Sequence, residues 1–125
     1  MTNTTNLQDI GAGAYASIKE LVKAYQSARN EIDCDAARDR ILDDALSVLV
    51  REDWHTPGQA SDEFGKYQIL ISTGGPATRI IGDLNQYGEP ENATLQAQDW
   101  FQPWTDYTGA DENILLAYAT QFYFG

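Results

Sequence analysis

The sequence is poor in basic residues, and this scarcity limits what the chain can bind. Its 125 residues include 8 lysines and arginines against 19 aspartates and glutamates, which gives a formal net charge of −11. Direct binding to DNA, RNA or an anionic lipid surface requires a basic footprint that this composition does not supply. We therefore expect neither nucleic acid nor a membrane as a direct partner.

Residues that carry covalent and metal chemistry are equally scarce. Cys34 is the only cysteine and His55 the only histidine, so an intrachain disulfide and the usual cysteine or multi-histidine zinc sites are excluded. The longest apolar runs, such as Ile114 to Ala119, are far shorter than a membrane-spanning helix. The first ten residues lack the basic and apolar stretches of a secretory signal. A cytoplasmic location is the expectation.

What remains is enough for one folded domain. A chain of this length corresponds to a single domain, and hydrophobic residues make up 42% of it, which suffices for a core. Residues 1–13 are polar and contain two glycines, so we expect a flexible N-terminal arm there. The single domain is then predicted over residues 14–125.

Hydrophobic periodicity predicts a helical hairpin at the start of this domain. Residues 14–30 carry apolar side chains at the i, i+3, i+4, i+7 spacing of a helix with one buried face. A second helix is predicted to begin near Asp33 or Asp35, either of which can cap its first turn, and to end at about Glu52. The break around Glu31 is short enough for an antiparallel hairpin.

The C-terminal half predicts a small sheet and a final helix. Alternating side chains indicate three strands, at residues 66–72, 78–84 and 93–98. Short turns would join them as an antiparallel meander. Residues 99–107 are aromatic and broken by Pro103, which is typical of an edge strand or an ordered loop covering the core. A capping box from Thr108 to Asp111 predicts a following helix. The expected fold is α+β: an N-terminal helical hairpin, a three-stranded antiparallel sheet and a C-terminal helix.

Negative charge is concentrated in two segments of the chain. Residues 31–63 carry ten acidic and three basic side chains, and residues 80–125 carry seven acidic and no basic ones, a net −7 each. Residues 1–30 contribute +1 and residues 64–79 contribute +2. The anionic character therefore belongs to parts of the chain and not to its whole length.

Within the second predicted helix, three aspartates recur at a regular spacing. Asp35, Asp39 and Asp43 are four residues apart, so they would line one solvent-facing strip at steps of about 6 Å. A regular array of negative charge is what a nucleic-acid mimic requires. Because Arg38 and Arg40 lie within reach along the helix, a solvated face that keeps the protein soluble is the alternative interpretation.

No pattern in the sequence indicates a catalytic, cofactor or metal site. His55 has no recognisable nucleophile partner, and a loop position is the simpler reading. The glycine-rich segment from Thr73 to Ala77 lacks the lysine of a phosphate-binding loop, so a tight turn explains it better. Glu89 and Glu91 flank a proline, where solvated turn positions are favoured over an acid–base pair.

Several short segments resemble small acidic proteins carried by phages and other bacterial mobile elements. The likeness covers about residues 66–125 and is carried by turn, strand and core positions: Thr73-Gly-Gly-Pro-Ala77, Arg79-Ile-Ile-Gly82, Gln98-Asp-Trp100, Pro103-Trp-Thr105, Leu115-Leu-Ala-Tyr118 and Phe122-Tyr-Phe-Gly125. Some proteins of this kind inhibit host defence, as anti-CRISPR and anti-restriction proteins do, often by occupying the surface where a nuclease complex holds nucleic acid. The resemblance implies that functional class, inside a bacterial host cell, and assigns no individual site residue.

Charge and resemblance together favour a non-enzymatic inhibitor of a host defence complex. It would dock its acidic faces on a basic nucleic-acid channel, by mimicry of nucleic acid or by blocking the channel. Tryptophan is enriched at interface hot spots, so the aromatic segment would add an apolar anchor. The predicted partner-binding residues are Asp35, Asp39, Asp43, Asp44, Glu89, Glu91, Asp99, Trp100, Trp104 and Asp106.

Other functions fit the same sequence. A structural or accessory domain would bind its partner through the aromatic patch around Trp100 and Trp104, with little dependence on salt. A small enzyme would use His55 or paired carboxylates inside a concave pocket. The surplus of aromatic side chains could equally serve a homodimer interface.

Overall fold

The structure, a computed structural model, describes residues 7–51, 57, 65–73, 76–99 and 102–124. These residues form three helices and one five-stranded sheet, so the α+β class is confirmed. In chain order the elements are α1 (Leu7–Gln26), α2 (Glu31–Asp44), β1 (Ser47–Arg51), β2 (Lys66–Ser72), β3 (Ala77–Asp83), β4 (Thr94–Gln98), β5 (Thr105–Asp106) and α3 (Glu112–Ala119).

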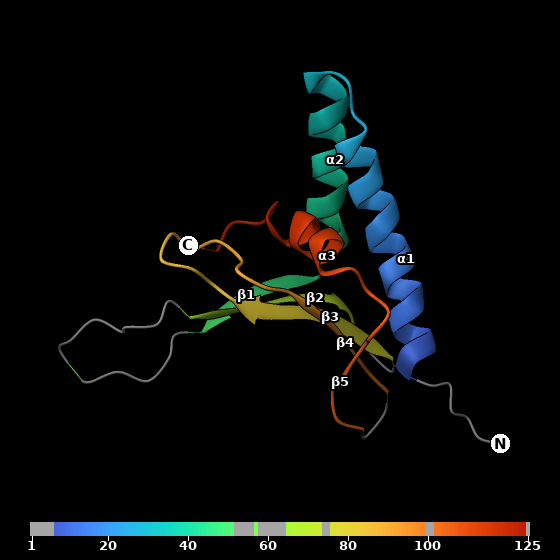
Figure 1. The fold of residues 1–125 in the computed structure, drawn as a ribbon, viewed down its shortest axis with the longest axis vertical. Coiled ribbons are helices and arrows are strands. Elements are labelled where there is room, and N and C mark those ends of the chain that lie inside the picture. The colour runs from blue at the N-terminus through green and yellow to red at the C-terminus, as the bar shows by residue number, and fades with distance from the viewer. Residues whose placement is uncertain (1–6, 52–56, 58–64, 74–75, 100–101, 125) are drawn as a thin grey trace.

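The sheet is an antiparallel meander in which spatial order follows chain order, β1 to β5. The three central strands lie within one residue of the predicted positions, but the prediction of a three-stranded sheet is wrong. β1 is added at one edge by pairing with β2, and the short β5 is added at the other by pairing with β4. All five strands and the three helices are labelled in Figure 1.

The error at β1 comes from a run of apolar residues that suits either a helix or a strand. The second helix was expected to reach Glu52, which lies outside the described residues, but α2 ends at Asp44 and Ala45 turns extended, with φ −80° and ψ 138°. The amide of Leu46 then donates to the carbonyl of Leu70 at 2.8 Å, which starts the pairing with β2. The valines that follow are β-branched and favour a strand.

The N-terminal boundary of the first helix also differs from the prediction. α1 begins at Leu7, so residues 7–13 of the predicted flexible arm are helical. Contacts with a distant segment hold this first turn: Gln8 donates to the Asp106 carbonyl at 2.9 Å and accepts from the Thr108 amide at 3.2 Å. Gly11 is buried against the ring of Tyr107. These contacts outweigh the low helix propensity of glycine.

Both remaining helices use caps other than the predicted ones. α2 begins after Asn30, whose side-chain oxygen accepts from the amide of Asp33 at 2.8 Å, so Asp33 lies in the first turn and does not cap it. α3 is capped by Asp111, which accepts from the amide of Asn113 at 2.9 Å, in place of the expected Thr108. In both helices the cap is a short polar side chain, as helix termini require.

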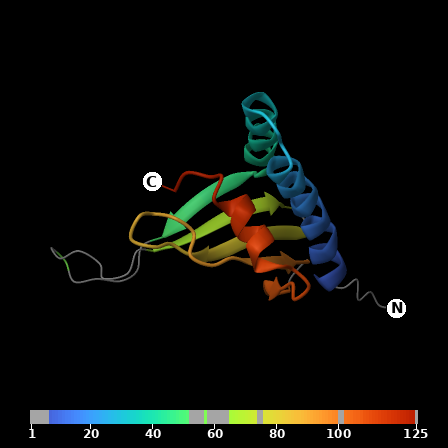
Figure 2. The same cartoon turned by 45° about the horizontal axis from the view of Figure 1, so that its top comes forward.

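The core lies between the sheet and the three helices. It contains Ile18 and Val22 from α1, Ile41 from α2, Leu115 and Tyr118 from α3, and Tyr67, Ile69, Ile80 and Leu95 from the strands. Figure 2 shows α3 lying across one face of the sheet with α1 beside it. The described helices leave the opposite face uncovered, and the α1–α2 hairpin projects beyond the sheet (Figure 1). No helix in the described ranges has the length and apolar character needed to cross a membrane.

Candidate functional site

The first candidate surface is the acidic strip, formed by Asp35, Asp39 and Asp43 on α2. All three side chains are exposed, and they follow the helix at the four-residue spacing that places them on one side. In the described part of the chain, no ion pair joins Arg38 or Arg40 to any of them. The strip is therefore a line of negative charge that its own helix does not neutralise.

Asp44, the next acidic residue of α2, has a different environment. It is half-buried and accepts a hydrogen bond from the hydroxyl of Tyr118 at 2.7 Å. Burial, followed by the hydrogen bond to Asp44 and its charge, raises the pKa of the Tyr118 hydroxyl well above its ordinary value. Asp44 thus ties the last turn of α2 to α3, which is a role within the fold.

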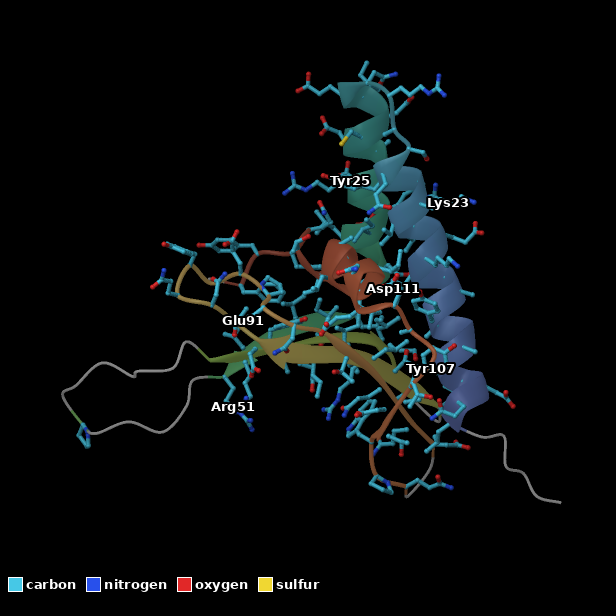
Figure 3. The ribbon with its side chains drawn as sticks, in the orientation of Figure 1. Lys23, Tyr25, Arg51, Glu91, Tyr107 and Asp111 are labelled. Atoms are coloured by element: carbon cyan, nitrogen blue, oxygen red, sulfur yellow. The ribbon has the colours of Figure 1, made fainter. Side chains whose placement is uncertain are left out.

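The other predicted partner-binding residues do not gather beside the acidic strip. Glu89 and Glu91 are exposed in the connection between β3 and β4, where Figure 3 labels Glu91, and Asp99 is half-buried. Asp106 is exposed on β5, and Figure 1 shows β5 at the opposite end of the molecule from α2. Trp100 and His55 lie outside the described residues. The structure therefore separates the acidic candidates into several places.

The second candidate surface is the sheet face that the described helices leave uncovered, called here the open sheet face. Residues directly opposite each other in neighbouring strands share a face, so the strand register defines three rows of side chains on it. The rows are Arg51, Lys66 and Asp83; then Leu49, Gln68, Ile81 and Thr94; then Ser47, Leu70, Arg79, Gln96 and Asp106.

Arg79 lies at the centre of the open sheet face and is held on three sides. Its Nε donates to Gln96 Oε1 at 2.8 Å and its Nη1 donates to Gln68 Oε1 at 2.7 Å. Its guanidinium carbon lies 4.1 Å from the ring centroid of Trp104, within the range of a cation–π contact. Gln96 is held in turn, because its amide donates to Asp106 at 2.8 Å. Partial burial lowers the pKa of Arg79, although an arginine stays protonated at any physiological pH.

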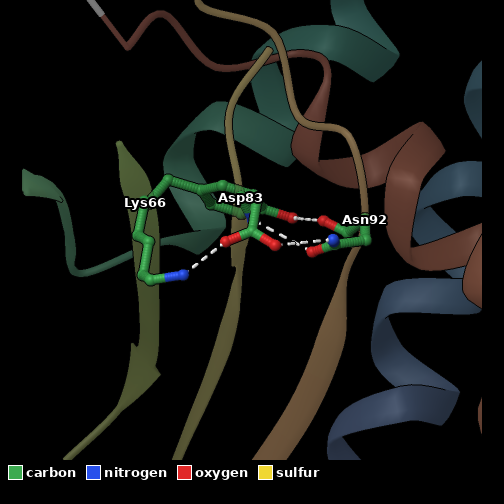
Figure 4. Close-up of polar contacts among 4 residues, drawn as sticks. Lys66, Asp83 and Asn92 are labelled. Atoms are coloured by element: carbon green, nitrogen blue, oxygen red, sulfur yellow. Dashed lines mark hydrogen bonds and ion pairs between the residues drawn. The ribbon is translucent and has the colours of Figure 1, made fainter. Parts of the chain in front are cut away.

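A cluster of polar contacts fixes one margin of this face (Figure 4). Lys66 forms an ion pair with Asp83 at 2.6 Å, and Asn92 donates to the other carboxylate oxygen of Asp83 at 2.9 Å. The side-chain oxygen of Asn92 also accepts from the amide of Asp83 at 2.9 Å. The hydrogen bond from Asn92, and after it that from Lys66, lowers the pKa of Asp83 below its ordinary value.

A hollow of about 660 Å³ lies on the open sheet face and is lined by residues of β1 to β4 and by Asn92. Its basic lining residues are Arg51, Lys66 and Arg79, three of the eight basic residues in the whole chain. Its acidic lining residue is Asp83, which Lys66 neutralises. Leu49 and Ile81 add apolar surface.

Sequence reasoning did not identify this hollow. The available signal was the net charge of +2 in residues 64–79. Within this segment, the alternation of a strand places Lys66 and Gln68 on the side opposite Tyr67 and Ile69. Trp104 was predicted as a partner anchor, and the structure shows it half-buried against Arg79.

The described ranges contain no metal-ligand cluster. No group of three or more histidine, cysteine, aspartate or glutamate side chains there is placed to hold a metal ion. Glu89 and Glu91 are exposed turn residues and do not line the hollow.

Compared with known proteins, the chain matches no protein-family model, no curated protein and no solved structure.

Proposed function

We propose that this protein is a non-enzymatic inhibitor that inserts the acidic strip of α2 into a basic nucleic-acid channel of another protein, a host defence complex. The observation that carries this proposal is the exposed strip of Asp35, Asp39 and Asp43, which forms no ion pair within the described residues. Like charges at this spacing cost a helix a few tenths of a kcal/mol per pair, about the size of a surface ion pair. Binding of the strip to a basic partner would offset this repulsion.

The position of α2 supports the same proposal. The α1–α2 hairpin projects beyond the sheet (Figure 1), so a narrow element can enter a channel while the sheet stays outside. Successive aspartates lie about 6 Å apart along the helix, and this gives a linear, repeating array of charge like that of a phosphate backbone. Opposite fields would steer the encounter, so association should be fast and sensitive to salt.

The test replaces the strip without changing the shape of its side chains. The variant Asp35→Asn, Asp39→Asn, Asp43→Asn removes three negative charges from exposed positions, so its stability should stay close to that of the unchanged protein. The matched control Glu20→Gln, Glu89→Gln, Glu91→Gln removes the same charge from exposed positions elsewhere. Any difference between the two variants then reports the position of the charge and not its total.

The assay begins with capture from a nuclease-treated bacterial lysate at 0.1 M and 1 M NaCl. The partner is released from the captured complex at 1 M NaCl and returned to 0.1 M NaCl. A labelled oligonucleotide is then bound to it, and displacement of the oligonucleotide by added protein is followed by fluorescence anisotropy. The unchanged protein and the control should displace the oligonucleotide, while the strip variant should need about tenfold or more protein. Capture without displacement, or equal displacement by the strip variant, would contradict the proposal.

A further inference from the structure

We propose that the open sheet face is a binding site for a small organic anion with an apolar body, whose acidic group is held by the guanidinium of Arg79. This site is separate from the acidic strip, and it requires neither the strip nor its partner. The proposal rests on three observations: the charge of the hollow, the preparation of Arg79 for an anion, and the apolar surface beside it.

The charge of the hollow is opposite to that of the rest of the molecule. Arg51, Lys66 and Arg79 line it, and the neighbouring carboxylate of Asp83 is already paired with Lys66. Arg51 and Arg79 therefore leave a positive surplus in a protein whose net charge is −11. Figure 3 shows Arg51 on the side of the sheet away from the helices. A small anion meets this local positive field, whereas a polyanion such as RNA would also meet the repulsion of the whole molecule.

Arg79 is oriented for an anion before any ligand arrives. Two of its five N–H groups are occupied, by Gln96 and Gln68, and Trp104 supports the plane of the guanidinium. Its Nη2 has no hydrogen-bond partner among the described residues. The planar fork that remains fits a carboxylate, sulfonate or phosphate, and its fixed geometry lowers the entropy lost on binding.

The same hollow offers apolar surface to the rest of such a ligand. Leu49 of β1 is 56% exposed, and its row on the open sheet face continues through Gln68 and Ile81 to Thr94. A volume of about 660 Å³ falls within the range of sites for small organic ligands. An inorganic ion would fill little of it, so the ligand should combine an acidic head with an apolar body.

Three probes separate these requirements. 8-Anilinonaphthalene-1-sulfonate has both the acidic head and the apolar body, N-phenyl-1-naphthylamine has the same body without the sulfonate, and sulfate has the charge alone. Binding to the full chain is followed in ¹H–¹⁵N NMR spectra through the Arg79 Nε–H signal and the side-chain amides of Gln68 and Gln96. We expect saturable shifts of these signals with the sulfonate probe, and binding of the other two weaker by about tenfold or more. 1-Naphthoate and 1-naphthyl phosphate then show which acidic head is preferred.

Variants assign the interaction to named side chains. Arg79→Gln should weaken the sulfonate probe by about tenfold or more, because one charge-assisted hydrogen bond is worth that factor. Arg51→Gln, at an exposed position, should also weaken it and does not depend on the Arg79 network. Lys23→Gln is the matched control, since it removes one positive charge from the exposed surface of α1, where Figure 3 labels it.

The probe experiments and the variant experiments can each overturn the proposed anion site. Equal affinity of the two naphthyl probes, or NMR shifts confined to residues outside the hollow, would overturn the proposal. So would Arg79→Gln and Arg51→Gln variants that bind no more weakly than Lys23→Gln. Because none of these measurements involves α2, their failure would leave the proposed inhibitory function standing, and the converse also holds.

Discussion

Two glycines of α1 provide a direct test of how the N-terminal helix is fixed to the sheet. Gly11 and Gly13 are both helical, but their surroundings differ. A Cβ added at Gly11 would lie 2.7 Å from the Cβ and Cγ of Tyr107, whereas a Cβ at Gly13 would have nothing within 4 Å. Alanine at these two positions therefore has the same effect on helix propensity, but only alanine at position 11 disturbs the packing.

The expected magnitudes follow from these contacts. Gly13→Ala should stabilise the protein by about 0.5–1 kcal/mol, because alanine is favoured over glycine inside a helix. Gly11→Ala gains the same amount but must displace the ring of Tyr107, and overpacking of this kind costs about 1–3 kcal/mol. The two variants should thus differ in free energy of unfolding by about 1–3 kcal/mol. For a chain of this length that corresponds to about 4 °C or more in Tm.

Circular dichroism during thermal and urea unfolding measures both variants under the same conditions. A double variant, Gly11→Ala with Tyr107→Gly, removes both the obstructing Cβ and the ring, and it should recover the benefit of alanine at position 11 relative to Tyr107→Gly alone. If Gly11→Ala and Gly13→Ala were equally stabilising, the packing of α1 against Tyr107 would be refuted. If neither changed stability, residues 7–13 would be a loose arm and not a helix.

Two further predictions concern polar contacts inside the domain. Tyr118→Phe should cost about 1–2 kcal/mol in urea unfolding, because the hydroxyl loses its hydrogen bond to a carboxylate, Asp44; Tyr123→Phe, at a position that is 85% exposed, should cost nothing. The pKa of Asp83 is lowered in the folded state, so its contribution to stability is present above the unfolded pKa of about 3.9 and is lost as pH falls through the folded pKa. Asn92→Ala should therefore lose less stability than the unchanged protein between pH 5 and pH 2, and its Asp83 carboxyl should titrate at higher pH by NMR.

The parts of the fold that the sequence predicts well are those fixed by local pattern. β2 lies at residues 66–72 as predicted, because alternation along seven residues defines both its ends and its buried side. The exposure of the acidic strip follows in the same way from a four-residue spacing on a helix. Neither conclusion needs information from elsewhere in the chain.

The parts that could not be predicted depend on contacts between distant residues. The apolar run at the end of the predicted second helix becomes β1 because β2 offers a free edge for pairing, and local periodicity contains no signal of that edge. The start of α1 depends on Gln8 and Gly11 meeting a segment about 100 residues later. The open sheet face requires the register of neighbouring strands and the placement of Trp104 over Arg79, and a single sequence supplies neither.

The acidic strip and the basic residues that line the hollow lie on opposite sides of the sheet, and this bears on how the acidic residues can act. α2 projects on the helical side of the molecule, while Arg51, Lys66 and Arg79 line the hollow on the opposite face. Because Asp106 lies far from α2, no single channel can contact all the acidic candidates at once. Under the proposed function, contact is therefore expected from the acidic strip, and the remaining carboxylates would act only through their long-range field. Charges that act through the field change the association rate and its salt dependence, whereas charges in contact change the dissociation rate. Kinetics of the two triple variants would therefore separate contact from steering, even if their affinities differed little.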